Sequence, residues 1–264
     1  MKVSVSTGLF YMRSHTDVLD VLQRADCRYI ELFMNQSFID LPIATMEKEI
    51  SRRNLEVLSI HLPLAPFAYE RNESEEFWIN RGLKYLDVLG ANMLVTHFHH
   101  LRNDSKANND ESHLELLRRH TPLTSRIICT ENLPVHLPES LLHDMDGLAR
   151  FLKENSCHVT FDTTHCATMG GDLIQDFRKL KDHVRNIHLS DFSAGVEHLV
   201  LGTGDLPLKD FIEELVVQGY KHPLTLEYDF ENRSRNRIDN YDQAIEAIRG
   251  SMDFVKSVIE ESAS

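Results

Sequence analysis

Hydrophobic and polar residues alternate along short segments that recur through the whole chain. The period of two and the many Val, Ile and Thr residues in these segments predict β-strands. The predicted strands cover residues 3–7, 28–33, 56–61, 92–98, 126–131, 157–162, 185–189 and 223–228. They begin roughly 25 to 38 residues apart, the length of a strand and a returning helix, so the spacing predicts an α/β fold, the (β/α)₈ TIM barrel.

The segments between the strands have the hydrophobic spacing of amphipathic helices. Residues 74–90 begin with Ser74, a residue type that caps helices, and stop at Gly90. Residues 239–261 predict one long closing helix that contains Gly250. No domain boundary is visible along the sequence, so residues 1–264 are expected to form a single barrel domain.

Six of the predicted strands end on residue types that bind metal ions. Because the carboxyl ends of barrel strands meet at one face, where active sites of this fold lie, side chains far apart in the sequence should converge there. His, Asp and Glu are ligands for Zn²⁺, Mn²⁺, Co²⁺ and Mg²⁺. The six residues are His61, His97, Glu131, Asp162, His188 and Glu227.

The last four strands supply three carboxylates and one imidazole, which can hold a divalent ion and leave positions for substrate oxygens. Without a cation, a buried carboxylate cluster would repel itself and take up protons. Each residue alone could be a helix cap or an arginine partner, but four in register favour a metal site. The predicted primary ligands are Glu131, Asp162, His188 and Glu227.

The remaining histidines allow several roles. His61 and His97 could carry a second metal bridged by Glu131, bind substrate hydroxyls, or be hydrogen-bonded histidines at strand ends. His165 lies three residues after Asp162 and could face the same centre. His198 precedes the sequence LGTG in the loop after the seventh strand.

Two further acids follow or end strands. Glu31 ends the second strand, where it could bind a substrate hydroxyl or form a salt bridge at the barrel mouth. Asp191 lies just past His188, where it could orient a metal-bound imidazole or cap the next turn.

The composition bounds the class of protein. The 264 residues are 42% hydrophobic, enough for a large core, and carry a formal net charge of −13. Affinity for nucleic acid depends on a basic surface, so nucleic acid is not expected as a partner. The four cysteines show no CxxC pairing, the N-terminus has no signal-peptide core, and no run could span a membrane. A soluble cytoplasmic protein is expected.

Long polar segments follow three of the strands. Residues 62–73 contain Phe67 and Tyr69, which could cover a ligand, and residues 99–113 are either functional or disordered. In residues 230–240, Arg233, Arg235 and Arg237 could bind an anionic group of a substrate or form a solvated basic loop. Specificity is expected to lie in these three segments.

The chain resembles the xylose-isomerase-like barrel superfamily, which joins sugar (phosphate) isomerases and epimerases with endonuclease IV. The resemblance spans nearly the whole chain and rests on SIHLPL, LVTHFHH, the Glu131-Asn132 pair in CTENLP, FDTTH, IHLSD, HLVLGTGDLPL and LTLEYD. It implies that Glu131, Asp162, His188 and Glu227 are the shared metal ligands. It also implies that His165 contacts substrate, as in the epimerases, or binds a third zinc, as in the nuclease.

By the same resemblance, His61, His97, His165 and His198 fall where endonuclease IV has further zinc ligands. One ligand of that pattern is missing. The nuclease has Asp-x-His before LGxG, whereas this chain has Val196-Glu197-His198, and valine cannot bind a metal. Glu197 is expected to point elsewhere unless the loop shifts, so one or two metals are expected rather than three.

The preferred hypothesis is a metal-dependent isomerase or epimerase acting on a small sugar or similar hydroxy-carbonyl compound. The metal (Mn, Co, Mg or Zn) would stabilise an enediolate, with Glu131 and Glu227 moving the proton. A dehydratase could begin with the same proton abstraction. The expected substrate contacts are His165, His61, Glu31 and Arg233. Homo-oligomers are common among such barrels, but nothing in the sequence sets a subunit number.

The alternative is a zinc-dependent phosphoester hydrolase of the AP endonuclease type, with two metals bridged by Glu131. It accounts better for the extra histidines, whereas the isomerase accounts better for the acidity and for Val196. A non-catalytic protein that binds sugar or metal is a third class, disfavoured by the full set of acid–base residues.

Overall fold

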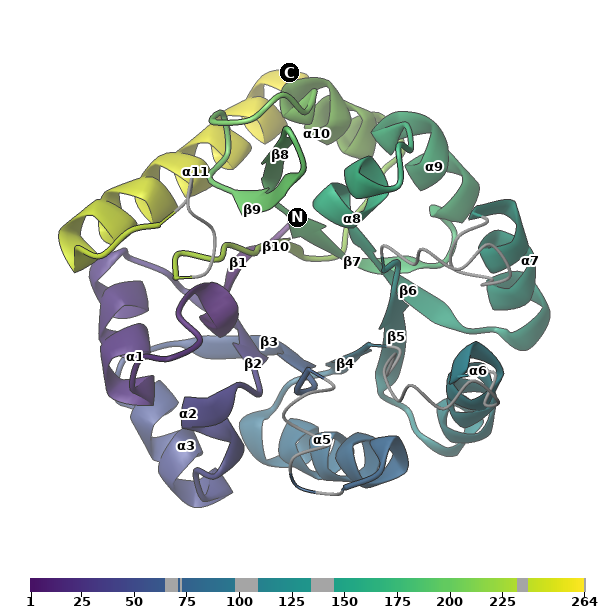
Figure 1. Ribbon diagram of the computed structural model, residues 1–264, viewed down its shortest axis with the longest axis horizontal. Helices are drawn as coiled ribbons and strands as arrows, with labels where there is room; N and C mark the ends of the chain where they lie inside the picture. The colour runs from purple at the N-terminus through teal and green to yellow at the C-terminus, as the bar shows by residue number, and fades with distance from the viewer. Residues whose placement is uncertain (65–70, 72, 98–108, 134–144, 232–236, 264) are drawn as a thin grey trace.

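Eight parallel strands close into a barrel at the centre of the molecule (Figure 1). The computed structural model describes residues 1–64, 71, 73–97, 109–133, 145–231 and 237–263. The strands are β1 (Val3–Ser6), β2 (Tyr29–Phe33), β3 (Glu56–His61), β4 (Met93–Thr96), β5 (Ile127–Glu131), β6 (His158–Asp162), β7 (Val184–Leu189) and β10 (Leu224–Leu226). Each pairs with its neighbour in the sequence, and β1 pairs with β10 to close the ring. The predicted barrel is confirmed.

Helices surround the barrel on all sides (Figure 1). They are α1 (His15–Arg24), α2 (Gln36–Ile39), α3 (Ile43–Ser51), α5 (Glu75–Leu89), α6 (Asn109–His120), α7 (Met145–Asn155), α8 (Thr163–Thr168), α9 (Leu173–Leu180), α10 (Leu208–Val217) and α11 (Tyr241–Ser262), with 3₁₀ turns η1 (Thr7–Leu9) and η2 (Thr121–Leu123). The Ser74 hydroxyl accepts the Phe77 N–H to start α5, and left-handed Gly90 ends it, as predicted. Within the described residues, no helix combines the length and the apolar character that crossing a membrane requires.

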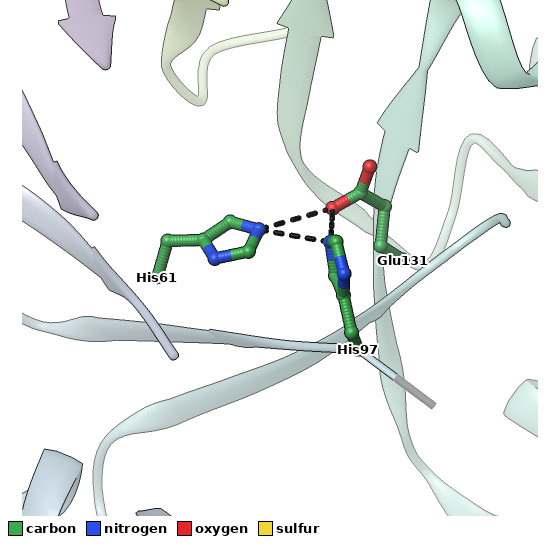
Figure 2. A group of neighbouring side chains, drawn as sticks. All are labelled: His61, His97 and Glu131. Carbon is green, nitrogen blue, oxygen red and sulfur yellow. Dashed lines mark hydrogen bonds and ion pairs between the residues drawn. The ribbon is translucent and has the colours of Figure 1, made fainter. Parts of the chain in front are cut away.

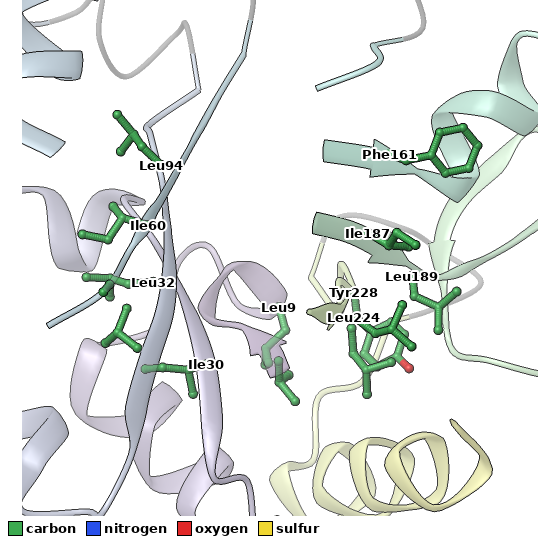
Figure 3. Close-up of a cluster of buried hydrophobic side chains, with 14 of the residues drawn as sticks. Leu9, Ile30, Leu32, Ile60, Leu94, Phe161, Ile187, Leu189, Leu224 and Tyr228 are labelled. Atoms are coloured by element: carbon green, nitrogen blue, oxygen red, sulfur yellow. The ribbon is translucent and has the colours of Figure 1, made fainter. Parts of the chain in front are cut away.

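Apolar strand residues point outward and pack between the barrel and the helices. Ile30, Ile60 and Ile187 are fully buried in this layer, together with Phe161 and Leu94 (Figure 3). Because side chains alternate along a strand, the residues between them face the barrel interior. The outward layer therefore holds most of the hydrophobic core, and the interior is left for other side chains.

The barrel interior contains a hydrogen-bonded chain of polar side chains. Ser59 Oγ and Asn186 Nδ2 donate to Glu31 Oε2 at 2.7 and 3.0 Å. Thr225 Oγ1 donates to Asn186 Oδ1 at 2.9 Å, and the Ser4 hydroxyl lies 2.9 Å from Thr225 Oγ1. All five residues are fully buried. Barrels of this type are usually filled with branched aliphatic residues, so this chain places a carboxylate where most have a hydrocarbon.

A two-stranded antiparallel hairpin, β8 (Asp191–Ser193) and β9 (Val196–Leu199), follows β7 and was not predicted from the sequence. Its two turn residues, Ala194 and Gly195, both have positive φ, 50° and 78°. Two-residue hairpin turns need this backbone to match the twist of the strands. The usual signal is Asn-Gly or Asp-Gly, so an Ala-Gly turn between three- and four-residue strands leaves little trace in the sequence.

We expect Phe161→Ala to lower the free energy of unfolding by about 3–5 kcal/mol, because the ring is fully buried against Phe177 and Phe211 and its loss leaves a cavity. Denaturant unfolding measures the change. Phe77→Ala, at an exposed position of α5, is the matched control and should change stability little. Equal losses in the two variants would contradict this description of the core.

Candidate metal centre and active site

Six side chains from six strands meet at the carboxyl face of the barrel. Each is the last residue of its strand, the next residue, or the last but one. They are His61, His97, Glu131, Asp162, His188 and Glu227. Five of these residues are at most 9% exposed, and the side chain of the sixth, His97, is 14% exposed. The structure brings these side chains together, as the strand ends predicted. Their roles as metal ligands remain predictions.

His188 lies among the three carboxylates predicted to be metal ligands. Its Nδ1 is 3.0 Å from Glu227 Oε2, 3.3 Å from Glu131 Oε2 and 3.9 Å from Asp162 Oδ2. One ligand atom from each of the four residues lies within 4.8 Å of the others. Four atoms this close can coordinate one ion after small side-chain adjustments.

The cluster contains a buried ligand atom that has no hydrogen bond among the described residues. Asp162 Oδ2 is the clearest case: it is buried and accepts no hydrogen bond, and its ion pair with His188 is long, at 3.9 Å. A buried carboxylate oxygen or imidazole nitrogen without a partner carries a desolvation penalty that a cation removes. Three carboxylates with one imidazole are a suitable donor set for Mn²⁺, Co²⁺, Mg²⁺ or Zn²⁺. The residues present therefore fit a divalent metal ion.

The orientation of Asp162 is fixed by its surroundings. Its Oδ1 accepts the His165 N–H at 2.7 Å and the Thr164 hydroxyl at 3.0 Å, which caps helix α8. The Asn132 side chain accepts the Asp162 N–H at 2.7 Å and donates to the Asp162 carbonyl at 3.0 Å. These contacts occupy one carboxylate oxygen and leave Oδ2 toward the cluster.

A second group of ligand atoms lies beside the first and shares Glu131 with it (Figure 2). His97 Nε2 is 2.8 Å from Glu131 Oε2 and 2.9 Å from His61 Nε2, and His61 Nε2 is 3.4 Å from the same oxygen. Atoms bonded to one tetrahedral Zn²⁺ lie about 3.3 Å apart. His61 Nδ1 donates to the Leu62 carbonyl at 2.7 Å, which leaves Nε2 with its lone pair toward the group.

A third group contains a residue that the sequence reasoning had set aside. Ligand atoms of His165, Glu197 and His198 lie within 4.8 Å of one another. Glu197, which was expected to point elsewhere unless the loop shifts, therefore lies with these two histidines. His198 has a left-handed backbone, φ 54°, which breaks the alternation of side chains along β9 and lets neighbouring residues share a side. A positive φ at a histidine cannot be read from the sequence.

Glu31 lies on the inner side of His188, away from the cluster centre. Its Oε1 is 3.0 Å from His188 Nε2, while Oε2 accepts the hydrogen bonds from Ser59 and Asn186. A carboxylate behind a histidine fixes which ring nitrogen carries the proton and orients the other toward a metal. Of the two roles expected for Glu31, the structure has the ion pair, and the substrate contact remains a prediction.

The histidines of the site compensate the negative charge of its carboxylates. Burial alone would raise the pKa of Glu131, but His188 and His97 hold it well below its usual value. Burial would likewise lower the pKa of His165, yet the carboxylates of Asp162 and Glu131 raise it to about 10. Burial dominates at His97 and lowers its pKa to about 4. Protons on imidazoles thus supply the positive charge that a cation would otherwise bring.

Asp191 organises the segment after the hairpin. Its Oδ2 accepts the N–H groups of Gly202 and Gly204 at 2.9 and 2.8 Å, and Oδ1 accepts those of Phe192 and Leu206 at 2.9 and 3.1 Å. Of the two roles expected for Asp191, the structure has the cap. This carboxylate anchors the return of the chain from the strands that carry Glu197 and His198.

Several predicted contacts lie outside the described residues. These are Arg233, Arg235, Phe67 and Tyr69. Arg237 is described, and its guanidinium pairs with Asp239 at 3.1 Å on the surface, where both side chains are exposed. The anionic-group role expected for the arginines stays a prediction.

The sequence was compared with models of known protein families. A family model described as a xylose isomerase-like TIM barrel matches residues 19–251. The chain belongs to this family. The resemblance drawn from the strand-end motifs is confirmed.

Proteins similar to this xylose isomerase-like barrel match most or all of its chain. An uncharacterised protein of Mycobacterium bovis is 22% identical over 91% of this chain and 93% of its own, and one of Mycobacterium tuberculosis matches equally. A solved D-tagatose 3-epimerase-like protein has a TM-score of 0.77 at 18% identity, covering 100% of both chains. An L-ribulose 3-epimerase has 0.75 at 15% identity, covering 100% of this chain and 96% of that one. At these identities the likeness shows a shared fold.

We expect Gly204→Ala to destabilise the protein, because an added Cβ would lie 2.4 Å from Asp191 Oδ1 and 2.6 Å from the Phe192 carbonyl. A loss of about 1–3 kcal/mol in the free energy of unfolding follows from such overpacking. Gly250→Ala is the control: the added methyl meets nothing within 4 Å in helix α11, so stability should rise by up to about 1 kcal/mol. Thermal and denaturant unfolding distinguish the two, and unchanged stability in Gly204→Ala would contradict the role assigned to Asp191.

Proposed function

We propose that this xylose isomerase-like barrel is a divalent-metal-dependent isomerase or epimerase of a small sugar or similar hydroxy-carbonyl compound. The observation that carries the proposal is the buried cluster of Glu131, Asp162, His188 and Glu227, in which one ligand atom from each residue lies within 4.8 Å of the others. The names of the solved relatives, among them a D-psicose 3-epimerase with D-tagatose from Clostridium cellulolyticum H10, support the sugar class.

The chemistry divides between the carboxylates and the imidazoles. A cation held by the four ligands would polarise a substrate carbonyl and its neighbouring hydroxyl, which acidifies the carbon between them. Glu131 and Glu227 would lie on either side of that carbon, one removing its proton and the other returning it. Delivery to the opposite face inverts the carbon, and delivery to the adjacent carbon moves the carbonyl.

The histidines would bind and orient. His165 Nδ1 is engaged by the Asn132 carbonyl at 3.1 Å and lies 2.9 Å from Glu131 Oε1, so Nε2 is the nitrogen left for a substrate oxygen. Phe33 packs against the His61 ring with 4.3 Å between centroids. Together these side chains would restrict a substrate to the space above the carboxylates and exclude water from it.

The second candidate is a phosphoester hydrolase with two or more metals. It is favoured by the second group, in which His61, His97 and Glu131 converge, and by the presence of Glu197 beside His165 and His198. The net charge of −13 weighs against a DNA substrate. The two candidates differ in the number of metals that the reaction needs.

We expect purified protein to contain about one divalent metal per chain by elemental analysis, because the four-residue cluster has the fuller donor set. Glu131→Ala should lose this metal, whereas His61→Ala should retain it. Two or more zinc ions in the wild type, one of them lost in His61→Ala, together with cleavage of abasic-site DNA, would replace the isomerase by the hydrolase. A wild type without bound metal, and unable to bind added Mn²⁺, Co²⁺ or Zn²⁺, would refute both.

We expect the metal-loaded protein to epimerise one or more ketoses in a panel that includes D-tagatose, L-ribulose and D-psicose. Glu227→Gln should lower kcat by about 10²- to 10⁴-fold, since it removes a proton-transfer group. Glu213→Gln, an equivalent change on the surface of α10, is the control and should have wild-type kcat. Exchange of substrate hydrogen with solvent deuterium, followed by NMR, reports the proton step directly, and full turnover by Glu227→Gln would contradict its role.

A further inference from the structure

A buried histidine on the outer side of the barrel contacts the two strands that carry His97 and Glu131. His113, in helix α6, is 1% exposed. Its Nε2 lies 3.3 Å from Thr96 Oγ1 and 3.1 Å from Thr130 Oγ1, and both threonines are fully buried. Its Nδ1 pairs with Glu75, the first residue of α5. One imidazole thus joins two helices to the ends of β4 and β5.

The directions of these hydrogen bonds follow from the partners. A carboxylate only accepts, so Nδ1 carries the proton toward Glu75. In the neutral imidazole Nε2 is then an acceptor with one lone pair, which the two threonine hydroxyls share, the nearer being Thr130. These contacts hold the imidazole ring in place, and the ring in turn holds the ends of β4 and β5 in their relative positions along the barrel axis.

The two threonines are partners in the sheet and directly precede candidate ligands. Thr96 pairs with Thr130 in the β4–β5 ladder. The next residues, His97 and Glu131, face the opposite side of the sheet, because side chains alternate along a strand. There His97 Nε2 and Glu131 Oε2 lie 2.8 Å apart. The relative position of the threonine hydroxyls outside therefore sets the relative position of the ligand atoms inside.

We propose that His113 and Glu75 are positioning residues, which hold the ends of β4 and β5 in the alignment that lets His97 and Glu131 act on one metal ion or substrate. The inference deepens the proposed function and rests on it. His113 and Glu75 lie on helices, and among the described residues they act on the site through Thr96 and Thr130 and the backbone of β4 and β5. The helical layer behind the barrel thereby contributes to the geometry of the carboxyl face.

The test compares two histidines on the same helix. His113→Leu keeps most of the side-chain volume and removes both ring nitrogens. His120→Leu is the matched control, since His120 is also buried in α6 and also lies near an acid at the start of α5, Glu76, at 3.5 Å. His113→Gln restores a polar group that the threonines can reach. Affinity for Co²⁺ and Zn²⁺ is measured by chelator competition, well below the unfolding temperature of each variant.

We expect His113→Leu to bind metal about 10- to 100-fold more weakly than wild type, the range found when a residue supporting a metal ligand is lost. His113→Gln should recover part of this loss, and His120→Leu should bind like wild type. Metal affinity equal to wild type in folded His113→Leu, or an equal loss in His120→Leu, would overturn the inference.

Hydrogen exchange separates this inference from the proposed function. In metal-free protein, His113→Leu should speed amide exchange at the ends of β4 and β5 while leaving β1 and β2 protected. If wild-type protein binds no metal, the proposed function fails, and the exchange pattern still decides the positioning role. Uniform protection in all four strands would refute that role.

Discussion

Negative charge buried at the centre of the barrel is the constraint on which the rest of the site depends. Glu131, Asp162 and Glu227 meet at the carboxyl face, and Glu31 lies below them inside the barrel. Carboxylates this close repel one another in a medium of low dielectric constant, so the fold must supply compensating positive charge or bound protons. Imidazoles surround the acids for this reason, and the raised pKa values of His165 and His188 follow from it. A bound metal cation could supply the same positive charge in place of the imidazole protons.

The site is held from two directions. From inside the barrel, the polar chain that runs from Ser4 to Glu31 ends at His188 and fixes the orientation of that ring. From outside, helix α6 reaches the ends of β4 and β5 through His113. The geometry of the cluster is therefore supported by the barrel wall on both of its sides.

The sequence predicted the barrel and the convergence of the strand ends because both depend on regular periods. A strand period of two and a repeat of one strand and one helix specify where the carboxyl ends fall, so Glu131 and Asp162 could be placed together without coordinates. The hairpin of β8 and β9 could not be predicted, since its strands are short and its turn lacks the usual residues. Glu197 was missed because the backbone at His198 departs from the alternation. His113 was missed because residues 99–113 were assigned to a polar loop, whereas helix α6 begins at Asn109.

The Ala194–Gly195 turn has a consequence for how such barrels diverge. Lengthening or shortening this turn by one residue would exchange the faces of Val196 and Glu197, because side chains alternate along the strand that follows. A carboxylate could then be gained or lost at the mouth without any substitution at the ligand position itself. Insertions and deletions in hairpins of this kind offer evolution, and protein engineers, a way to change the number of ligands while the eight central strands stay the same.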